Sequence, residues 1–122
     1  MILLIDDNAT ERALARKILE GGGYAVREAA DGAEGLASFR EAQPDLVLCD
    51  LMMPGKNGFD TVRELRALEP TARIVAISGV LFVVADHDTL RESLGLAGVV
   101  EKPFRPVRLL QAVREALGVT EA

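Results

Sequence analysis

Short runs of apolar residues alternate along the chain with longer stretches in which apolar residues recur at helical spacing. Three runs are apolar at every position: Ile2-Leu3-Leu4-Ile5, Leu46-Val47-Leu48-Cys49 and Ile74-Val75-Ala76-Ile77. Two shorter runs, Tyr24-Ala25-Val26 and Val99-Val100, repeat the pattern. Strands that are apolar on both sides suit a sheet covered on both faces, as parallel sheets are. The pattern therefore predicts five buried strands.

The stretches between these runs predict five helices. The apolar positions expected to share a helix face are Ala13, Leu14, Ile18 and Leu19 in the first helix, Leu36 and Phe39 in the second, Phe59, Val62, Leu65 and Leu68 in the third, and Val107, Leu110, Val113 and Leu117 in the fifth. A weaker fourth helix spans Asp86 to Leu94. The Gly21-Gly22-Gly23 triplet ends the first helix, Pro44 and Pro70 limit the second and third, and Pro106 lies in the first turn of the last.

Strand and helix thus alternate five times, which predicts an α/β fold with a doubly wound parallel sheet and right-handed crossovers. We find no internal repeat or linker, so residues 1–122 are expected to form a single domain with no effector domain. No run approaches the 18 apolar residues of a membrane span, and the first run stops at two aspartates. The chain is therefore expected to be cytoplasmic, without a signal peptide or a membrane contact.

Composition narrows the function further. A formal net charge of −5 disfavours a nucleic-acid-binding surface, which needs clustered lysine and arginine. The sole cysteine, Cys49, lies inside an apolar run and has no partner for an intramolecular disulfide. We expect it to be a small buried hydrophobic residue.

Polar residues follow four of the five predicted strands. Asp6 and Asp7 follow the first strand, Asp50 the third, Ser78 the fourth, and Lys102 comes shortly after the fifth. In a doubly wound sheet, ligands bind outside the carboxyl ends of the strands. The sequence therefore predicts that three carboxylates, a hydroxyl and an ammonium converge at one edge of the sheet.

The charges of this set indicate its chemistry. Two carboxylates about 4 Å apart repel by about 4 kcal/mol at an effective dielectric constant near 20, so the acids must take up protons or bind a cation. Oxygen ligands without histidine or cysteine favour Mg²⁺, with Mn²⁺ as the alternative. A metal, Lys102 and Ser78 around one carboxylate suit phosphoryl transfer, with Asp50 as the nucleophile that becomes an aspartyl phosphate.

These residues, in this order, resemble the response regulator receiver domain (CheY-like) of two-component signalling. The resemblance rests on Asp6-Asp7, on Asp50 followed by Met53-Pro54-Gly55 and Gly58, on Ser78, and on Lys102-Pro103-Phe104. It covers essentially all of the chain. It implies a flavodoxin-like sheet of five parallel strands in the order 2-1-3-4-5, with five helices.

The resemblance also implies roles for the acids. Asp50 would accept a phosphoryl group from a phosphohistidine on a sensor histidine kinase or a histidine phosphotransfer protein. Asp7 and Asp50 would bind Mg²⁺ directly, Asp6 largely through water, and Met52 through its backbone carbonyl.

The remaining family positions concern switching. Lys102 would pair with Asp50 and then with the phosphoryl group, Ser78 would move to bond a phosphoryl oxygen, and the bond before Pro103 would be cis. The family places an aromatic residue where this chain has Val99, so the usual coupling to Ser78 is in doubt. The apolar segment 79–85 either packs on the core or docks a partner, which leaves a homodimer open.

The expected function is therefore a phosphoacceptor that switches contacts with a downstream protein target. It would not be an enzyme beyond catalysing its own phosphorylation and dephosphorylation. One alternative is a degenerate receiver that acts as a phosphorylation-independent scaffold. A Mg²⁺-dependent phosphohydrolase of the haloacid dehalogenase type is disfavoured because Met52 stands where that family has a second acid. A nucleotide binder is disfavoured because Asp6 and Asp7 would repel phosphate.

Overall fold

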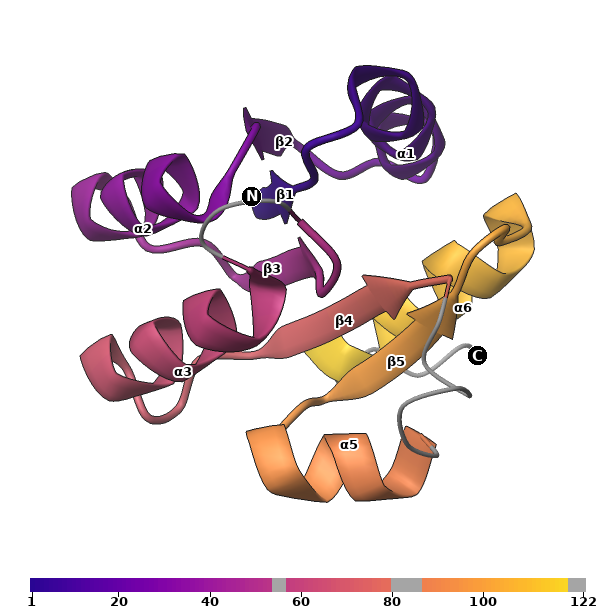
Figure 1. Ribbon diagram of the computed structural model, residues 1–122. Coiled ribbons are helices and arrows are strands. Elements are labelled where there is room, and N and C mark those ends of the chain that lie inside the picture. The colour runs from indigo at the N-terminus through magenta and orange to yellow at the C-terminus, as the bar shows by residue number, and fades with distance from the viewer. Residues whose placement is uncertain (54–56, 80–86, 119–122) are drawn as a thin grey trace.

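Five parallel strands and five helices make up the parts of the chain that the computed structural model describes, residues 1–53, 57–79 and 87–118. The sheet has the order β2-β1-β3-β4-β5, as Figure 1 shows. The strands are β1 (Ile2–Ile5), β2 (Val26–Ala29), β3 (Leu46–Asp50), β4 (Ile74–Ser78) and β5 (Gly98–Glu101). The helices are α1 (Ala9–Gly21), α2 (Gly32–Glu41), α3 (Gly58–Leu68), α5 (His87–Leu94) and α6 (Pro106–Leu117). The doubly wound α/β fold and its strand order are confirmed.

Helices cover both faces of the sheet. Helices α1 and α6 lie on one face, and α2, α3 and α5 lie on the other (Figure 1). Successive residues of a strand point to opposite faces, so Leu3 and Ile5 join the core under α2, α3 and α5. Ile2 and Leu4 join the core under α1 and α6. This two-sided burial is why β1 is apolar at every position, and why β3 and β4 are apolar up to the polar residue that ends each of them.

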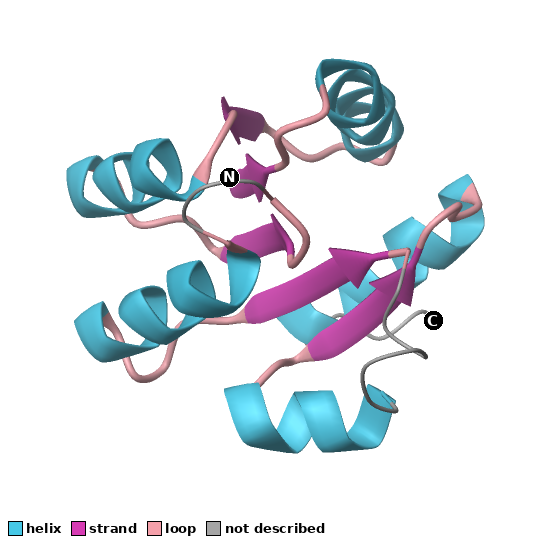
Figure 2. Cartoon of the chain, viewed as in Figure 1, coloured by secondary structure: helices cyan, strands magenta, loops and turns pink. Residues whose placement is uncertain are grey.

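The pairing register brings the carboxyl ends of the strands to one edge of the sheet. Ile5 pairs with Cys49, so the residues that follow β1 lie beside the end of β3. On the far side, Ser78 at the end of β4 pairs with Glu101 at the end of β5. The arrows of β4 and β5 accordingly point the same way in Figure 2.

Side-chain caps start three of the helices. Asn8, Asp31 and Asn57 each accept a hydrogen bond from the backbone N–H three residues further on, in α1, α2 and α3 respectively. Such caps satisfy N–H groups that the helix itself leaves free. Pro106 lies at the start of α6, and Gly118 ends that helix with a left-handed φ of 73°.

Two predicted helix faces were partly wrong. Leu14 in α1 and Val107 in α6 are 53% and 76% exposed, so neither lies in the core. The buried positions are Ala15 and Leu19 in α1, and Leu109, Ala112 and Val113 in α6. Neighbouring faces of one helix have the same period, so spacing alone left the choice between them open.

The apolar face predicted for the third helix also includes one residue that is exposed. Leu68 is 43% exposed, whereas Val62 and Leu65 have no exposed surface. A strict spacing of three residues falls short of the 3.6-residue turn, so the stripe drifts around the helix and its ends point in opposite directions. Phe59 and Leu68 therefore cannot both face the sheet squarely.

The second strand was predicted too early. It covers Val26–Ala29 rather than residues 24–26. It pairs with β1 alone and lies at the edge of the sheet, where charged side chains are tolerated. Arg27 pairs with Glu41 at 3.6 Å, and Glu28 pairs with Arg12 at 3.0 Å. Because these residues are polar, β2 lacks the continuous apolar run by which the other strands were predicted.

Cys49 has no exposed surface, which confirms the prediction of a buried residue. Burial, with smaller contributions from the charges of Asp50 and Asp6, raises the pKa of its thiol far above the usual value. Within the described residues, no helix is both long enough and apolar enough to cross a membrane. Pro54, Gly55 and all of the apolar segment 79–85 except Gly79 lie outside the described residues.

Candidate functional site

Two buried aspartates meet at the carboxyl edge of the sheet. Asp6 directly follows β1, Asp50 is the last residue of β3, and the two residues are 2% and 4% exposed. The pairing of Ile5 with Cys49 places them on adjacent strands at the same level. Burial of two carboxylates side by side is unfavourable unless a positive charge compensates them.

Lys102 supplies that charge. Its Nζ donates to Asp6 Oδ2 at 3.1 Å, to Asp50 Oδ2 at 2.9 Å and to Glu11 Oε2. An ammonium carries three protons, so all of them are engaged. The backbone N–H of Lys102 donates to the carbonyl of Ser78 at 3.1 Å, which fixes the lysine at the end of β4.

Backbone N–H groups hold the other oxygens of the two aspartates. Met52 donates its N–H to Asp50 Oδ1 at 2.9 Å, and Asn8 donates its N–H to Asp6 Oδ1 at 2.9 Å. Each buried carboxylate is therefore bonded at both oxygens, to Lys102 on one side and to the chain two residues ahead on the other. This fixes the direction of both side chains.

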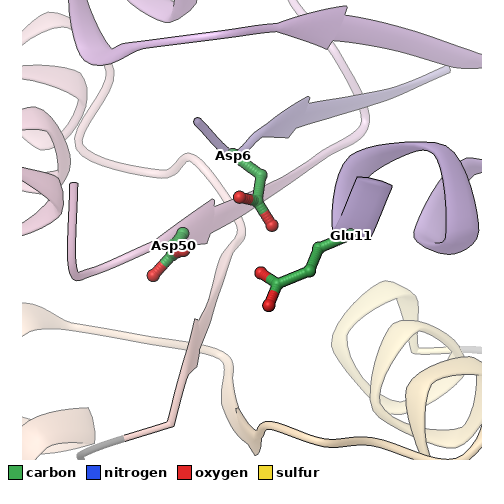
Figure 3. A group of neighbouring side chains, drawn as sticks. All are labelled: Asp6, Glu11 and Asp50. Carbon is green, nitrogen blue, oxygen red and sulfur yellow. The ribbon is translucent and has the colours of Figure 1, made fainter. Parts of the chain in front are cut away.

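Glu11 is a member of the cluster that the sequence analysis missed. It lies in the first turn of α1, where its N–H donates to Asn8 Oδ1 at 3.0 Å. Its carboxylate reaches toward Asp6 and Asp50 from the helix, as Figure 3 shows. The Asn8-x-x-Glu11 spacing is typical of a helix start. That signal places Glu11 near the end of β1 but does not say where its carboxylate points.

The environment shifts two pKa values. Burial raises the pKa of Asp6 above its ordinary value, and the charge of Asp50 adds to this, whereas the bonds from Asn8 and Lys102 oppose it. Burial lowers the pKa of Lys102, but hydrogen bonds to Glu11 and Asp50 and the charges of Asp50 and Asp6 outweigh it and raise the pKa on balance. The lysine is therefore held as the ammonium among an excess of carboxylates.

The cluster fits a divalent cation. One oxygen each of Asp6, Glu11 and Asp50 lies within 4.8 Å of the other two. Carboxylate oxygens of this kind suit Mg²⁺ or Mn²⁺ rather than softer metals. Asp7 is exposed and does not belong to this group of oxygens.

The switch positions lie on the neighbouring strands. Ser78 ends β4 at the same edge and is 1% exposed. Val99, which is 3% exposed, packs in the core with Leu94 and Leu96, so the position of the absent aromatic is filled by a small apolar side chain. The bond between Lys102 and Pro103 is cis, the isomer that the family resemblance implies.

A close approach of backbone to backbone fixes the end of β3. A Cβ at Gly58 would lie 2.1 Å from the Asp50 carbonyl oxygen and 2.3 Å from the Leu51 Cα. Only glycine fits at this point, because backbone atoms cannot move aside as a flexible side chain can. The start of α3 thus packs directly against the peptide that carries Asp50.

Comparison with known proteins assigns the family. The sequence model described as the response regulator receiver domain matches residues 2–114. This chain belongs to that family. It is 39% identical over 122 aligned residues to the DNA-binding response regulator MtrA of Mycolicibacterium paratuberculosis, with 95% of this chain and 50% of that protein covered. The chain spans about half the length of the MtrA relatives that it matches.

Relatives of similar length agree. The chain is 30% identical to the chemotaxis protein CheY of Thermotoga maritima, with 93% of this chain and 94% of that protein covered. The crystal structure of the NtrX receiver domain from Brucella abortus superposes with a TM-score of 0.88 at 28% identity, covering 98% of this chain and 100% of that one. The chain is thus a receiver domain of two-component response regulators, a signalling domain of CheY-like fold.

Proposed function

We propose that this receiver domain is the phosphoacceptor of a two-component system or phosphorelay, and that Asp50 takes the phosphoryl group from a phosphohistidine. One observation carries the proposal: the buried Asp50 carboxylate is bonded by Met52 N–H at 2.9 Å and by Lys102 Nζ at 2.9 Å, beside Asp6. A nucleophile held in one direction by its surroundings needs little reorganisation to react.

In the proposed step, one Asp50 oxygen attacks the phosphorus of the phosphohistidine. The new P–O bond forms as the P–N bond breaks, and the electron pair of that bond stays on the imidazole nitrogen, which takes a proton from solvent. Lys102 would face the charge on the phosphoryl oxygens, and the Ser78 hydroxyl would donate to one of them. The domain would catalyse only its own phosphorylation and dephosphorylation.

The donor set supports a resident Mg²⁺, with Mn²⁺ as the alternative. Asp7 and Asp50 would hold the ion directly, together with the backbone carbonyl of Met52, and Asp6 would hold it largely through water. The bound ion would neutralise charge on the phosphoryl oxygens. The carboxylate oxygens of Asp6, Glu11 and Asp50, within 4.8 Å of one another, support this assignment.

The proposed partners follow from this chemistry. The donor would be a sensor histidine kinase or a histidine phosphotransfer protein, and the output a change in contacts with a downstream protein. The net charge of −5 disfavours direct nucleic-acid binding by this domain. We further propose that residues 1–122 form a single receiver domain that acts in the cytoplasm.

Incubation with Mg²⁺ and acetyl phosphate, followed by intact mass measurement, tests the proposal. We expect one phosphoryl addition that the D50N variant lacks and the D60N variant keeps, because Asp60 is exposed in the first turn of α3. No addition to the native chain would favour a scaffold. Continued release of phosphate from the donor without a bound intermediate would favour a phosphohydrolase.

A further inference from the structure

We propose that Glu11 is a positioning residue of this site, which holds Lys102 in the unphosphorylated protein and releases it when a phosphoryl group arrives on Asp50. The inference rests on the proposed function of Asp50. It adds a fourth acid with a role of its own, acting through Lys102.

The hydrogen-bonding capacity of Lys102 is full. Its ammonium has three protons, and these go to Asp6, Asp50 and Glu11. A phosphoryl oxygen on Asp50 can bond to Lys102 only if one of these acceptors gives up its place. The incoming group therefore competes with a carboxylate that is already there.

Glu11 is the acceptor that leaves most easily. The side chains of Asp6 and Asp50 are 2% and 6% exposed, and a backbone N–H from Asn8 or Met52 holds each of them in place. The side chain of Glu11 is 43% exposed, so water can replace Lys102 as its partner. Asp6 would have no such replacement if it lost Lys102. The Asp50 carboxyl, although it loses its charge in the acyl phosphate, is still held beside Lys102 by the N–H of Met52.

The surroundings leave room for this movement. A pocket of about 280 Å³ is lined by Glu11, Leu14, Lys102, Pro103 and Phe104, and Leu14 on its wall is 53% exposed. The Glu11 carboxylate can therefore turn away from Lys102 without any repacking of the core. A doubly charged phosphoryl group nearby would repel it in the same direction.

Glu11 would thus influence the equilibrium between the unphosphorylated and the phosphorylated protein. With the carboxylate in place, Lys102 is occupied and the phosphoryl group must displace it. With glutamine at position 11, the side chain keeps its shape but loses the charge that binds the ammonium. The phosphorylated state should then become more stable relative to the unphosphorylated state.

Beryllofluoride, a mimic of the phosphoryl group on aspartate, gives the test at a Mg²⁺ concentration that saturates every variant. Its dissociation constant is measured by NMR for the native protein, E11Q and E34Q. Glu34 is the matched control because it occupies the same position in α2, with its N–H bonded to Asp31 Oδ1 at 2.8 Å. In the native protein, the ¹³C signal of the Glu11 carboxylate is followed during the titration.

We expect E11Q to bind beryllofluoride about three- to tenfold more tightly, the range for one ordinary hydrogen bond in a protein, because Glu11 is partly exposed and glutamine can still accept a bond from Lys102. We expect E34Q to bind like the native protein. The Glu11 signal should move to the value of a free glutamate as the mimic binds. Unchanged or weaker binding by E11Q, or a Glu11 signal that does not move, would overturn the inference alone. Failure of all three proteins to bind the mimic would instead overturn the proposed function.

Discussion

Lys102 Nζ and Asp50 Oδ2 lie 2.9 Å apart, although 52 residues separate them in the chain. The contact joins the end of β5 to the end of β3 across the intervening strand β4. It exists because parallel strands deliver their carboxyl ends to one edge of the sheet. The same contact orients Asp50 for reaction and compensates the charge of two buried carboxylates, so both the chemistry and the stability of the site depend on it.

Removal of the lysine should destabilise the folded protein. We expect K102A to lower the free energy of unfolding by about 3 kcal/mol, because Asp6 and Asp50 would remain buried without their counter-ion. Urea denaturation in chelator measures the effect, and K17A, on the exposed face of α1, should stay within about 0.5 kcal/mol of the native protein. Mg²⁺ should stabilise K102A more than the native chain. An equal response of both proteins to Mg²⁺ would contradict this reading of the cluster.

Gly58 should be intolerant of any side chain. A Cβ there would lie 2.1 Å from the Asp50 carbonyl oxygen, so we expect G58A to cost about 3 kcal/mol of stability through overpacking. G21A is the matched control, because nothing lies within 4 Å of a Cβ at the last residue of α1. Denaturant midpoints should fall for G58A and hold or rise for G21A. A G58A protein as stable as G21A would show that α3 does not press on the end of β3.

Replacement of Ser78 should weaken binding of a phosphoryl group far more than binding of Mg²⁺. S78A removes a buried hydroxyl at the end of β4, and we expect it to weaken beryllofluoride binding about tenfold through the loss of one hydrogen bond to a charged group. Mg²⁺ affinity, measured by calorimetry, should be little changed. Loss of Mg²⁺ binding in a folded S78A protein would place Ser78 in the metal site instead.

Glu28 gives a pH-dependent stability. The hydrogen bond from Arg16, together with the bond from Arg12, lowers the pKa of Glu28 in the folded protein. A carboxyl with a lowered folded pKa stabilises the fold above the unfolded value near 4.3, and this is lost as pH falls through the folded pKa. We expect E28Q to be less stable than the native protein by at most about 1 kcal/mol at pH 7, since solvent screens a side chain that is 30% exposed. Urea titrations across pH should show this difference shrink in acid, and a difference that persists at the lowest pH would count against it.

The sequence predicted those parts of the fold where burial leaves no choice. β1, β3 and β4 are covered on both faces, so every residue in them is apolar except Asp50 and Ser78 at the strand ends. Each strand was found nearly to its last residue. β2 was misplaced because Arg27 and Glu28 belong to an edge strand, where ion pairs replace apolar contacts. Leu14 and Val107 were assigned to the core because adjacent faces of one helix share the same period.

The residues of the candidate site likewise fall into those that the sequence predicted and one that it did not. Asp6, Asp50 and Lys102 were expected together because each follows a strand, and strand ends meet wherever parallel strands pair. Glu11 was missed because its place depends on a flexible side chain that turns back from α1 to Lys102. Spacing along a sequence fixes where a backbone goes, but not which of several partners a long side chain takes.

Chemical trapping of the phosphorylated residue tests the central claim most directly. Borohydride reduces an aspartyl phosphate to homoserine, so peptide masses after treatment with acetyl phosphate and Mg²⁺ identify the acceptor. The account predicts homoserine at position 50 and at no other aspartate. Homoserine at Asp6 or Asp7, or a stable phosphoryl group on His87, would contradict it.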